Sequence, residues 1–286
     1  MPIDPDVARG AQLPGEEFGW SASDVLLYHL ALGAGADPLD ASELRYVLEN
    51  RLQVLPTFAV VAQTVHRFEP PAVEFPGISI DLAKVLHGTQ RIDVHRPLPP
   101  EGKARATARI KGVYDKGSAA VIETETLVSD LDGRPLWTNT SSIFARGEGG
   151  FGGDRGPSGA AAPPERAPDA VVVTPTVPQQ ALWYRLLGDR NPLHSDPEFA
   201  ASAGFPRPIL HGLCTYGMVC KAVVDAELGG DVTRVAGYGV RFTGVVFPGE
   251  SLRTSVWRED GRLVLVTTVD QRDNAPALTG AELVLA

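Results

Sequence analysis

The chain has 286 residues, with 26 Lys and Arg against 35 Asp and Glu, which gives a formal net charge of −9. Its length is that of two domains or one fused pair, and with 43% hydrophobic residues it can bury a sizeable core. The acidic balance argues against a chain-wide nucleic-acid or anionic-membrane surface, and the two cysteines, Cys214 and Cys220, are too few for a disulfide framework or a four-cysteine zinc site.

The sequence contains no segment typical of a targeting signal or a membrane span. Residues 1–16 have neither the basic nor the apolar region of a signal peptide. The longest apolar stretch, residues 209–226, is interrupted by His211, Lys221 and Asp225, which favours a buried helix over about residues 209–225. We therefore expect a cytoplasmic protein without a membrane span.

The first half of the chain, about residues 1–146, is predicted to contain a helix followed by strands. Ser21 precedes a helical pattern at residues 22–33, and an apolar stretch occupies residues 55–65. Segments rich in strand-forming residues then predict strands at residues 104–114, 119–129 and 135–145.

A linker rich in Gly and Pro is predicted at residues 147–168. It contains a formal G-x-G-x-x-G pattern at Gly147, Gly149 and Gly152. A dinucleotide-binding motif needs a helix directly after the glycines, because the helix N-terminus holds the pyrophosphate. More Gly and Pro follow here, so we interpret the pattern as part of the connector.

The second half, about residues 169–286, has a similar order of elements. Thr176 and Gln179 resemble a capping box that opens a helix ending at Gly188. A turn-rich segment at residues 189–197 precedes the long apolar helix. Val-rich and Thr-rich segments then predict strands at residues 235–244, 251–260, 262–271 and 277–285.

The two halves can be aligned with each other at two places. The segment YHLALGAGADPL (28–39) matches YRLLGDRNPLH (184–194), and VLPTF (54–58) matches ILHGL (209–213). The first copy lacks the Asp, Asn and His of the second. We infer a duplication in which only the second copy kept polar chemistry, and the alternative is chance similarity between two α+β domains.

The polar residues of the second copy follow a tight turn. Gly188 ends a helix, Asp189, Asn191 and Pro192 favour a turn, and His194 lies just beyond it. A carboxylate and an imidazole that share one water can act as a general acid/base pair, with Asn191 orienting either group. Alternatively, Asp189 caps the turn and His194 is a partly exposed loop residue.

This segment resembles the motif of the MaoC-like family of R-specific 2-enoyl-CoA hydratases. The matching positions are Tyr184, Leu186, the run of residues 188–194, Ala200, and the Gly-Phe-Pro-x-Pro-Ile-Leu-His-Gly run of residues 204–212. One departure is Leu187, where the family usually has a small residue. The motif covers about thirty residues, and the weaker two-copy resemblance covers nearly the whole chain.

The resemblance implies an α+β double hot-dog fold, in which each repeat has a long central helix wrapped by a curled antiparallel sheet. The N-terminal repeat, residues 1–146, would be non-catalytic and would shape the acyl tunnel, and residues 169–286 would carry catalysis. Asp189 and His194 would be the catalytic pair that adds water to a trans-2-enoyl thioester, giving an R-3-hydroxyacyl thioester. Which of the two is acid and which is base stays open.

Other site residues are expected on chemical grounds. Gly212, at the start of the long helix, is our candidate for the N–H that binds the thioester carbonyl. His211 is either a substrate contact or a structural residue. Arg207, Arg234 and Arg241 are candidates for contacts with coenzyme A phosphates or are plain surface charges. His29, His66, His87 and His95 have no metal-like spacing, so we expect surface or core roles.

Several functions are compatible with this sequence. The first is an enoyl-CoA hydratase of fatty-acid metabolism that needs no metal or redox cofactor, with coenzyme A as part of the substrate. The second is a dehydratase acting on R-3-hydroxyacyl groups of acyl-carrier protein. The others are a non-catalytic hot dog that binds acyl thioesters and a thioesterase. A homodimer is a further expectation.

Overall fold

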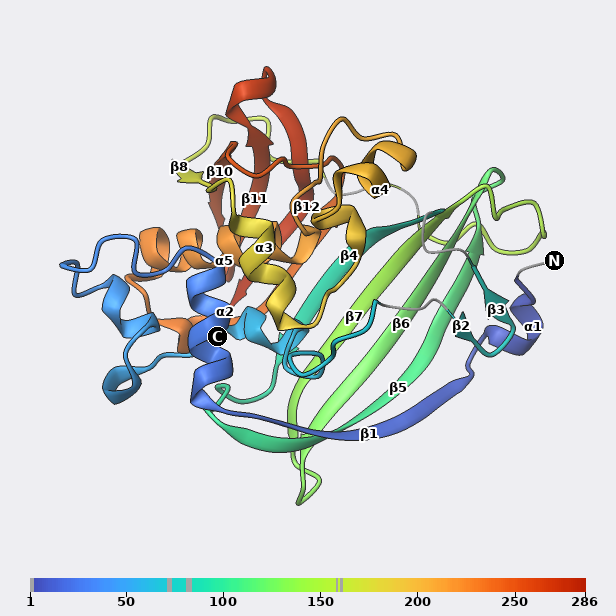
Figure 1. Cartoon of the computed structure of the whole chain (residues 1–286), viewed down its shortest axis with the longest axis horizontal. Helices are drawn as coiled ribbons and strands as arrows, with labels where there is room; N and C mark the ends of the chain where they lie inside the picture. The colour runs from blue at the N-terminus through green and yellow to red at the C-terminus, as the bar shows by residue number, and fades with distance from the viewer. Residues whose placement is uncertain (1–2, 71–73, 81–83, 158, 160–161) are drawn as a thin grey trace.

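The computed structural model describes residues 3–70, 74–80, 84–157, 159 and 162–286. Within these residues, ten strands form one antiparallel sheet in the order β1-β5-β6-β7-β4-β9-β12-β11-β10-β8, and β2 and β3 form a small second sheet. The large sheet curls around the helices α2, α3 and α5 (Figure 1). Its first five strands come from the first half and its last five from the second half, so the pairing of β4 with β9 joins the two halves.

The strands and helices have the following bounds. The strands of the large sheet are β1 Gln12–Trp20, β4 Val85–Val94, β5 Gly102–Asp115, β6 Ala119–Asp130, β7 Pro135–Arg146, β8 Ala170–Pro175, β9 Val235–Phe242, β10 Ser251–Glu259, β11 Arg262–Val269 and β12 Ala275–Leu285, and the small strands are β2 Glu74–Phe75 and β3 Ile78–Ser79. The α-helices are α1 Pro5–Ala8, α2 Ala22–Ala31, α3 Gln180–Tyr184, α4 Pro197–Ser202 and α5 Gly212–Leu228. Short 3-10 helices are η1 Glu43–Tyr46, η2 Glu49–Arg51, η3 Pro56–Val60, η5 Arg185–Leu187, η6 Pro192–His194, η7 Val232–Arg234 and η8 Asp270–Arg272.

The predicted strands of both halves are confirmed, and the long apolar helix is confirmed as α5. This helix has 17 residues, begins at Gly212 and ends before Gly229, which has a positive φ of 64°. The apolar residues Tyr216, Val219 and Val223 of α5 are buried in the hydrophobic core, and this burial stabilises the helix.

The first half departs from the expected repeat. Its apolar stretch at residues 55–65 contains the short 3-10 helix η3, which packs against α5, and its longest helix in the described residues is the ten-residue α2. Pro56 at the start of η3 favours a first helical turn, but the segment does not continue as a long helix. The second copy alone therefore supplies a long central helix.

The predicted capping box at Thr176 and Gln179 is wrong. The Thr176 hydroxyl donates to the Glu250 carbonyl at 2.7 Å, and Gln179 caps α3 without a side-chain hydrogen bond. The Gln180 side chain reaches across to the first half, where it donates to the carbonyl of Ala31 at 2.5 Å. A tertiary partner thus replaces the local cap.

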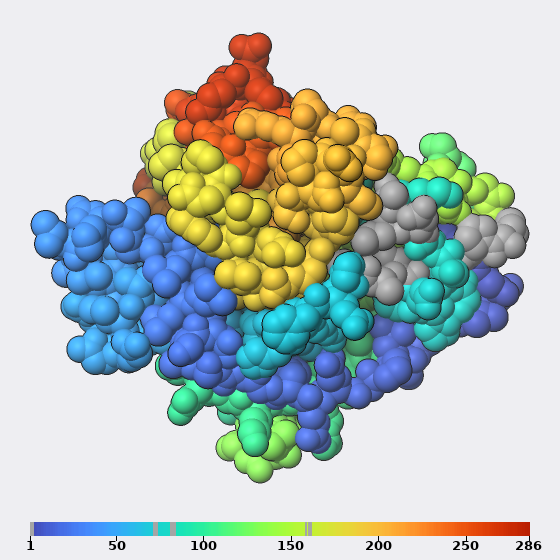
Figure 2. Space-filling model, in the orientation of Figure 1, coloured from blue at the N-terminus to red at the C-terminus, as the bar shows by residue number. Residues whose placement is uncertain are grey.

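The two halves share one hydrophobic core. Tyr28 of α2, Tyr184 of α3 and Phe58 of η3 are fully buried and belong to one cluster with α5. The ring centroids of Tyr28 and Tyr184 are 6.3 Å apart. Figure 2 shows the segment around α3, in yellow, packed against the blue-green segment of the first half. The hydroxyl of Thr64 in that segment donates to the Leu187 carbonyl at 3.2 Å.

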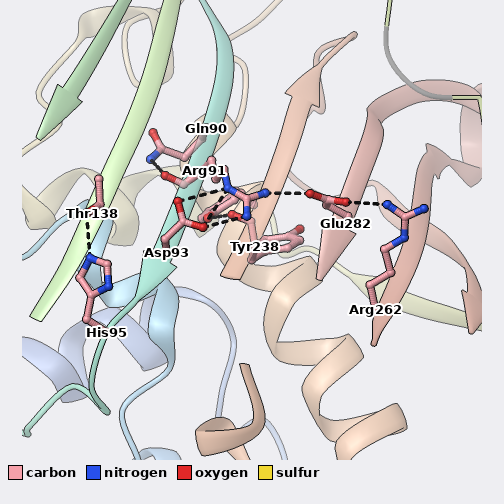
Figure 3. Close-up of polar contacts among 9 residues, drawn as sticks. Gln90, Arg91, Asp93, His95, Thr138, Tyr238, Arg262 and Glu282 are labelled. Atoms are coloured by element: carbon pink, nitrogen blue, oxygen red, sulfur yellow. Dashed lines mark hydrogen bonds and ion pairs between the residues drawn. The ribbon is translucent and has the colours of Figure 1, made fainter. Parts of the chain in front are cut away.

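A chain of ion pairs crosses the line where the halves meet. Arg91 of β4 contacts Asp93 on its own strand at 2.7 Å and Glu282 of β12 at 2.8 Å (Figure 3). Glu282 also pairs with Arg262 of β11 at 3.2 Å. Because these side chains are about one-third to one-half exposed, each pair stabilises the fold by about 1 kcal/mol or less. The buried core contributes more to holding the halves together.

The predicted linker contains no helix or strand in the part that the structure describes, and the next element after the glycine pattern is β8. In this described part, the glycines are not followed by the helix that a dinucleotide-binding motif needs. The start of the linker is fixed, since the Asp115 carboxylate accepts hydrogen bonds from the backbone N–H of Gly150 at 2.9 Å and of Gly152 at 2.6 Å. Among the described residues, no helix has the length and apolar character that crossing a membrane requires.

Acid is expected to destabilise this fold through His29. Its Nδ1–H donates to the Tyr46 carbonyl at 2.7 Å, and its Nε2 accepts from the Leu55 N–H at 3.2 Å. Protonation of Nε2 would break the second hydrogen bond and place a charge in the buried core. Burial lowers the pKa of His29 to about 4. Below pH 6.5 the unfolded chain binds a proton that the folded chain excludes, so the free energy of unfolding falls by about 3 kcal/mol between pH 6.5 and 4 from this group alone.

Urea unfolding at pH 7 and pH 5 tests this expectation. His29→Gln should lower stability at pH 7 but reduce the loss of stability between the two pH values. The exposed His95 provides the control, and His95→Gln should leave the free energy of unfolding at pH 7 unchanged. Equal pH dependence in wild type and His29→Gln would contradict the expectation.

Candidate active site

The turn after η5 depends on Gly188. This residue has a φ of 103°, in the region that favours glycine. A Cβ atom here would overlap the carbonyl oxygen of Thr64, which belongs to the first half. The backbone therefore reverses direction against the first half, and Asp189 begins the turn that carries the polar residues.

Replacing Gly188 by Ala is expected to destabilise the protein by about 3 kcal/mol, because the backbone must move away from Thr64. Gly204 in the same segment is a matched control. Its φ is 87°, but a Cβ there would meet no atom within 4 Å, so Gly204→Ala adds backbone strain without a clash. Thermal unfolding of both variants tests this expectation, and equal losses of stability in the two would contradict it.

Asp189 and Asn191 hold the turn through hydrogen bonds to the main chain. The Asp189 carboxylate accepts from the Asn191 N–H at 3.2 Å, and the Asn191 side-chain oxygen accepts from the Leu193 N–H at 3.0 Å. Asn191 thereby caps η6, in which Pro192 is the first residue. Its amide oxygen accepts the capping hydrogen bond, so its amide N–H groups are the ones that can orient a neighbouring side chain.

His194 is placed with its tautomer fixed. Its Nδ1–H donates to the Ile209 carbonyl at 2.9 Å, so Nε2 of the neutral ring is unprotonated. The residue is only 9% exposed, and this burial lowers the pKa of His194, with the negative charge of Asp189 acting in the opposite direction. A neutral imidazole next to a carboxylate is suited to accept a proton from water.

His211 lies behind this pair. Its ring stacks on His194 with centroids 3.8 Å apart, and its Nε2–H donates to the Asp189 carbonyl at 3.3 Å. The residue is 1% exposed and is not among the residues that line the neighbouring cavity. Burial lowers the pKa of His211 well below its usual value. This placement favours the structural alternative for His211 over a direct substrate contact.

Asp189, Asn191 and His194 face one cavity of about 610 Å³. Both halves form its walls. The second half contributes Gly212 and Thr215 at the start of α5 and Arg241 and Phe242 of β9. It also contributes several apolar side chains from the sequence range 193–278. From the first half come Phe75, Val85, Leu86, His87, Gly88, Ile143 and Phe144. The cavity is thus a mainly apolar space with a polar turn at one side.

Gly212 occupies the position expected for a carbonyl-binding N–H. It is the first residue of α5, where the backbone N–H has no partner within the helix. It lines the cavity, and a Cβ there would lie 3.2 Å from the Phe242 ring. A side chain at this position would push against that ring, so glycine leaves the approach to the N–H open.

The three candidate arginines are not brought together. Arg241 lines the cavity, and its guanidinium donates to the Gly159 carbonyl at 3.5 Å. Arg207 lies over the Phe247 ring at 4.9 Å, outside the cavity lining. Arg234 ends η7, also outside that lining, and its carbonyl accepts from the Ala286 N–H. Only Arg241 of these three therefore adjoins the cavity.

The ligand atoms of Asp189, His194 and His211 all lie within 4.8 Å of one another, as in some metal sites. The two imidazole rings are stacked at 28° to each other, however, so their in-plane lone pairs run side by side instead of meeting at one point. The three residues as placed therefore do not fit a metal ion.

Sequence reasoning missed the first-half residues of the cavity, above all His87. The sequence around His87 carries no motif, and its contact with Phe242 of β9 depends on the pairing of β4 with β9. Phe242 was also missed, because its place in the site depends on a tertiary contact with Gly212.

Two half-sheets of one chain, joined by the pairing of β4 with β9 and curled around the long helix α5 with a cavity at its N-terminus, define a double hot-dog protein. Residues 160–277 match the MaoC like domain family, and residues 18–147 match the MFE-2 hydratase 2 N-terminal domain family. The chain belongs to the MaoC-like family of hydratases and dehydratases. It is a hydro-lyase.

The similarity to relatives and to solved structures extends over nearly the whole chain. Enoyl-CoA hydratase ChsH3 of Mycobacterium tuberculosis is 62% identical over 286 residues, which cover 100% of both chains. The peroxisomal enoyl-CoA hydratase 2 of Arabidopsis thaliana is 40% identical over 96% of this chain and 93% of its own. The crystal structure of a MaoC-like dehydratase from Phytophthora capsici is similar with a TM-score of 0.88 and 31% identity, covering 99% of this chain and 98% of that one.

Proposed function

We propose that the protein catalyses the reversible R-specific hydration of trans-2-enoyl-CoA to (R)-3-hydroxyacyl-CoA. The observation that carries this proposal is the convergence of Asp189 and His194 on one largely apolar cavity, with the Nε2 of His194 unprotonated. The relatives named as enoyl-CoA hydratases, at 62% and 40% identity over nearly the whole chain, support the same reaction.

In the proposed reaction one water lies between the Asp189 carboxylate and the His194 ring. His194 Nε2 accepts a proton from the water while the oxygen forms a bond to C3 of the enoyl chain. The C2–C3 π electrons move toward the thioester, and the Gly212 N–H stabilises the developing enolate oxygen. The Asp189–His194 pair then delivers one proton to C2, so water is added with no net change in protons.

Hydration neither oxidises nor reduces the substrate, so we propose that it needs no redox cofactor. We also propose that it needs no metal, because the Asp189–His194 pair would activate the water. Coenzyme A enters as part of the substrate, and Arg241 at the cavity wall is the residue we assign to its charged portion. The apolar walls from β4 and β7 of the first half would accommodate the acyl chain.

The carrier, the setting and the assembly are further proposals. We propose a role in fatty-acid metabolism, with acyl-carrier protein as an alternative carrier of the same acyl groups. A cytoplasmic location and a homodimer stay predictions from the sequence, and several relatives are named as peroxisomal proteins.

The test is a hydration assay with trans-2-enoyl thioesters whose acyl chains range from four carbons to long chains. The reaction is monitored by the loss of absorbance of the conjugated enoyl thioester. The proposal predicts turnover of the CoA thioesters without release of free thiol. Equal or faster turnover of acyl-carrier-protein thioesters of the same chain length would favour the alternative carrier. Tight binding of enoyl-CoA without conversion, or release of free thiol, would contradict the proposal.

A further inference from the structure

The first half contributes one polar ring to the cavity through an irregular strand. In the pairing of β4 with β7, His87 lies opposite Ile143 and Thr89 lies opposite Ser142, so Gly88 is an extra residue in a β-bulge. Bulges redirect neighbouring side chains. The consecutive residues 85–88 all line the cavity, which a regular strand with alternating faces would not allow.

The His87 ring is held on two sides. Its Nε2–H donates to the Thr89 carbonyl across the bulge at 3.1 Å. Its ring packs on Phe242 of the second half, with centroids 4.7 Å apart. Burial lowers the pKa of His87 to about 4, against the opposing effects of the Thr89 carbonyl and the charge of Asp189, so the ring is neutral at physiological pH.

Phe242 connects this ring to the start of α5. The Phe242 ring lies against Gly212, whose ideal Cβ position is 3.2 Å from two of its carbon atoms. His87, Phe242 and Gly212 therefore form one continuous row of contacts from the first half to the backbone N–H assigned to the thioester carbonyl. The hydrogen bond of His87 to its own strand fixes the far end of this row.

We propose that His87 is a positioning residue for hydration, because its ring holds Phe242 against Gly212 and so aligns the thioester carbonyl with the Gly212 N–H. The non-catalytic first half thus takes part in the reaction through packing. This inference rests on the proposed hydratase function. It assigns His87 no proton transfer, since Asp189 and His194 perform that step.

The variants His87→Ala and His87→Phe separate packing from polarity. His87→Ala removes the ring that supports Phe242, and kcat should fall roughly 10- to 100-fold with little change in KM, because the alignment matters most in the transition state. His87→Phe restores a ring and should recover most of kcat. The pH profile of kcat/KM should be the same in wild type and His87→Phe.

A double-mutant cycle with Phe242→Leu completes the test. If His87 acts through Phe242, His87→Ala should add little to the loss caused by Phe242→Leu. Thermal unfolding of each variant identifies folded protein, and His87→Phe gives a readout even if His87→Ala does not fold. Wild-type kcat in folded His87→Ala, a loss in His87→Phe as large as in His87→Ala, or a lost limb of the pH profile would overturn the inference. Failure of the proposed function itself would appear separately, as absence of hydration by the wild-type enzyme.

Discussion

Replacing His194 by Asn is expected to lower kcat/KM for enoyl-CoA hydration by about 10²- to 10⁴-fold. The Asn amide nitrogen can take the place of Nδ1 and keep the hydrogen bond to the Ile209 carbonyl, so the local fold is retained. No group then remains at the position of Nε2 to accept the proton of water. The measurement is the initial rate of hydration of a short enoyl-CoA, together with the unfolding temperature.

The control for this variant is His95→Asn. His95, just after β4, contacts Thr138 of β7 at 2.9 Å (Figure 3). It does not line the cavity that His194 faces. We expect it to keep wild-type activity. Activity of His194→Asn within a few-fold of wild type would contradict the assignment of His194 as the proton acceptor.

The wild-type pH profile gives a second view of the same residue. Since burial lowers the pKa of His194, its neutral form persists below pH 6.5, and the acid limb of kcat/KM should lie below that value. A loss of activity already complete at pH 7 would conflict with this environment.

Replacing Asp189 by Asn is expected to cause a loss of similar size, about 10²- to 10⁴-fold in kcat/KM. The substitution keeps the shape of the side chain and an oxygen to accept from the Asn191 N–H, but removes the negative charge beside His194. Without that charge, the protonated form of His194 loses the electrostatic support that raises its pKa. The double variant Asp189→Asn/His194→Asn should be little worse than either single one, because the two residues act as a unit.

Asp196→Asn is the matched control for the carboxylate. Asp196 accepts from the N–H groups of Glu198 and Phe199 as the N-cap of α4, a role that Asn fills equally well. It lies outside the cavity lining, and we expect its replacement to leave hydration unchanged. Wild-type rates in Asp189→Asn, or an equal loss in Asp196→Asn, would show that the loss does not come from the charge of Asp189.

Local sequence patterns were sufficient for the elements whose stability is local. The apolar helix α5, the strands with alternating Val and Thr, and the turn at Gly188 all have a signal within a few residues. The strands β1, β4 and β8 were not predicted. In β1, Pro14 and Gly15 interrupt the pattern, and in β4 the bulge at Gly88 breaks the alternation that marks a strand.

The candidate site could be predicted where its residues lie close together in the sequence. Asp189, Asn191, His194 and Gly212 do face one cavity, as expected from the motif. His87 and Phe242 could not be found in this way, since their meeting depends on the pairing of β4 with β9. Charge alone does not predict which arginine adjoins the cavity, because the sequence does not distinguish Arg241, which lines it, from Arg234, which ends η7.

The configuration of the hydration product tests the central claim most directly, because one fixed arrangement of Asp189, His194 and Gly212 can present water to only one face of the enoyl chain. Crotonyl-CoA hydrated by the wild-type enzyme, with chiral separation of the 3-hydroxybutyryl product, is sufficient. The account predicts the R product from the wild type and its loss in His194→Asn and Asp189→Asn. An S product, or an R product formed at wild-type rates by both variants, would contradict it.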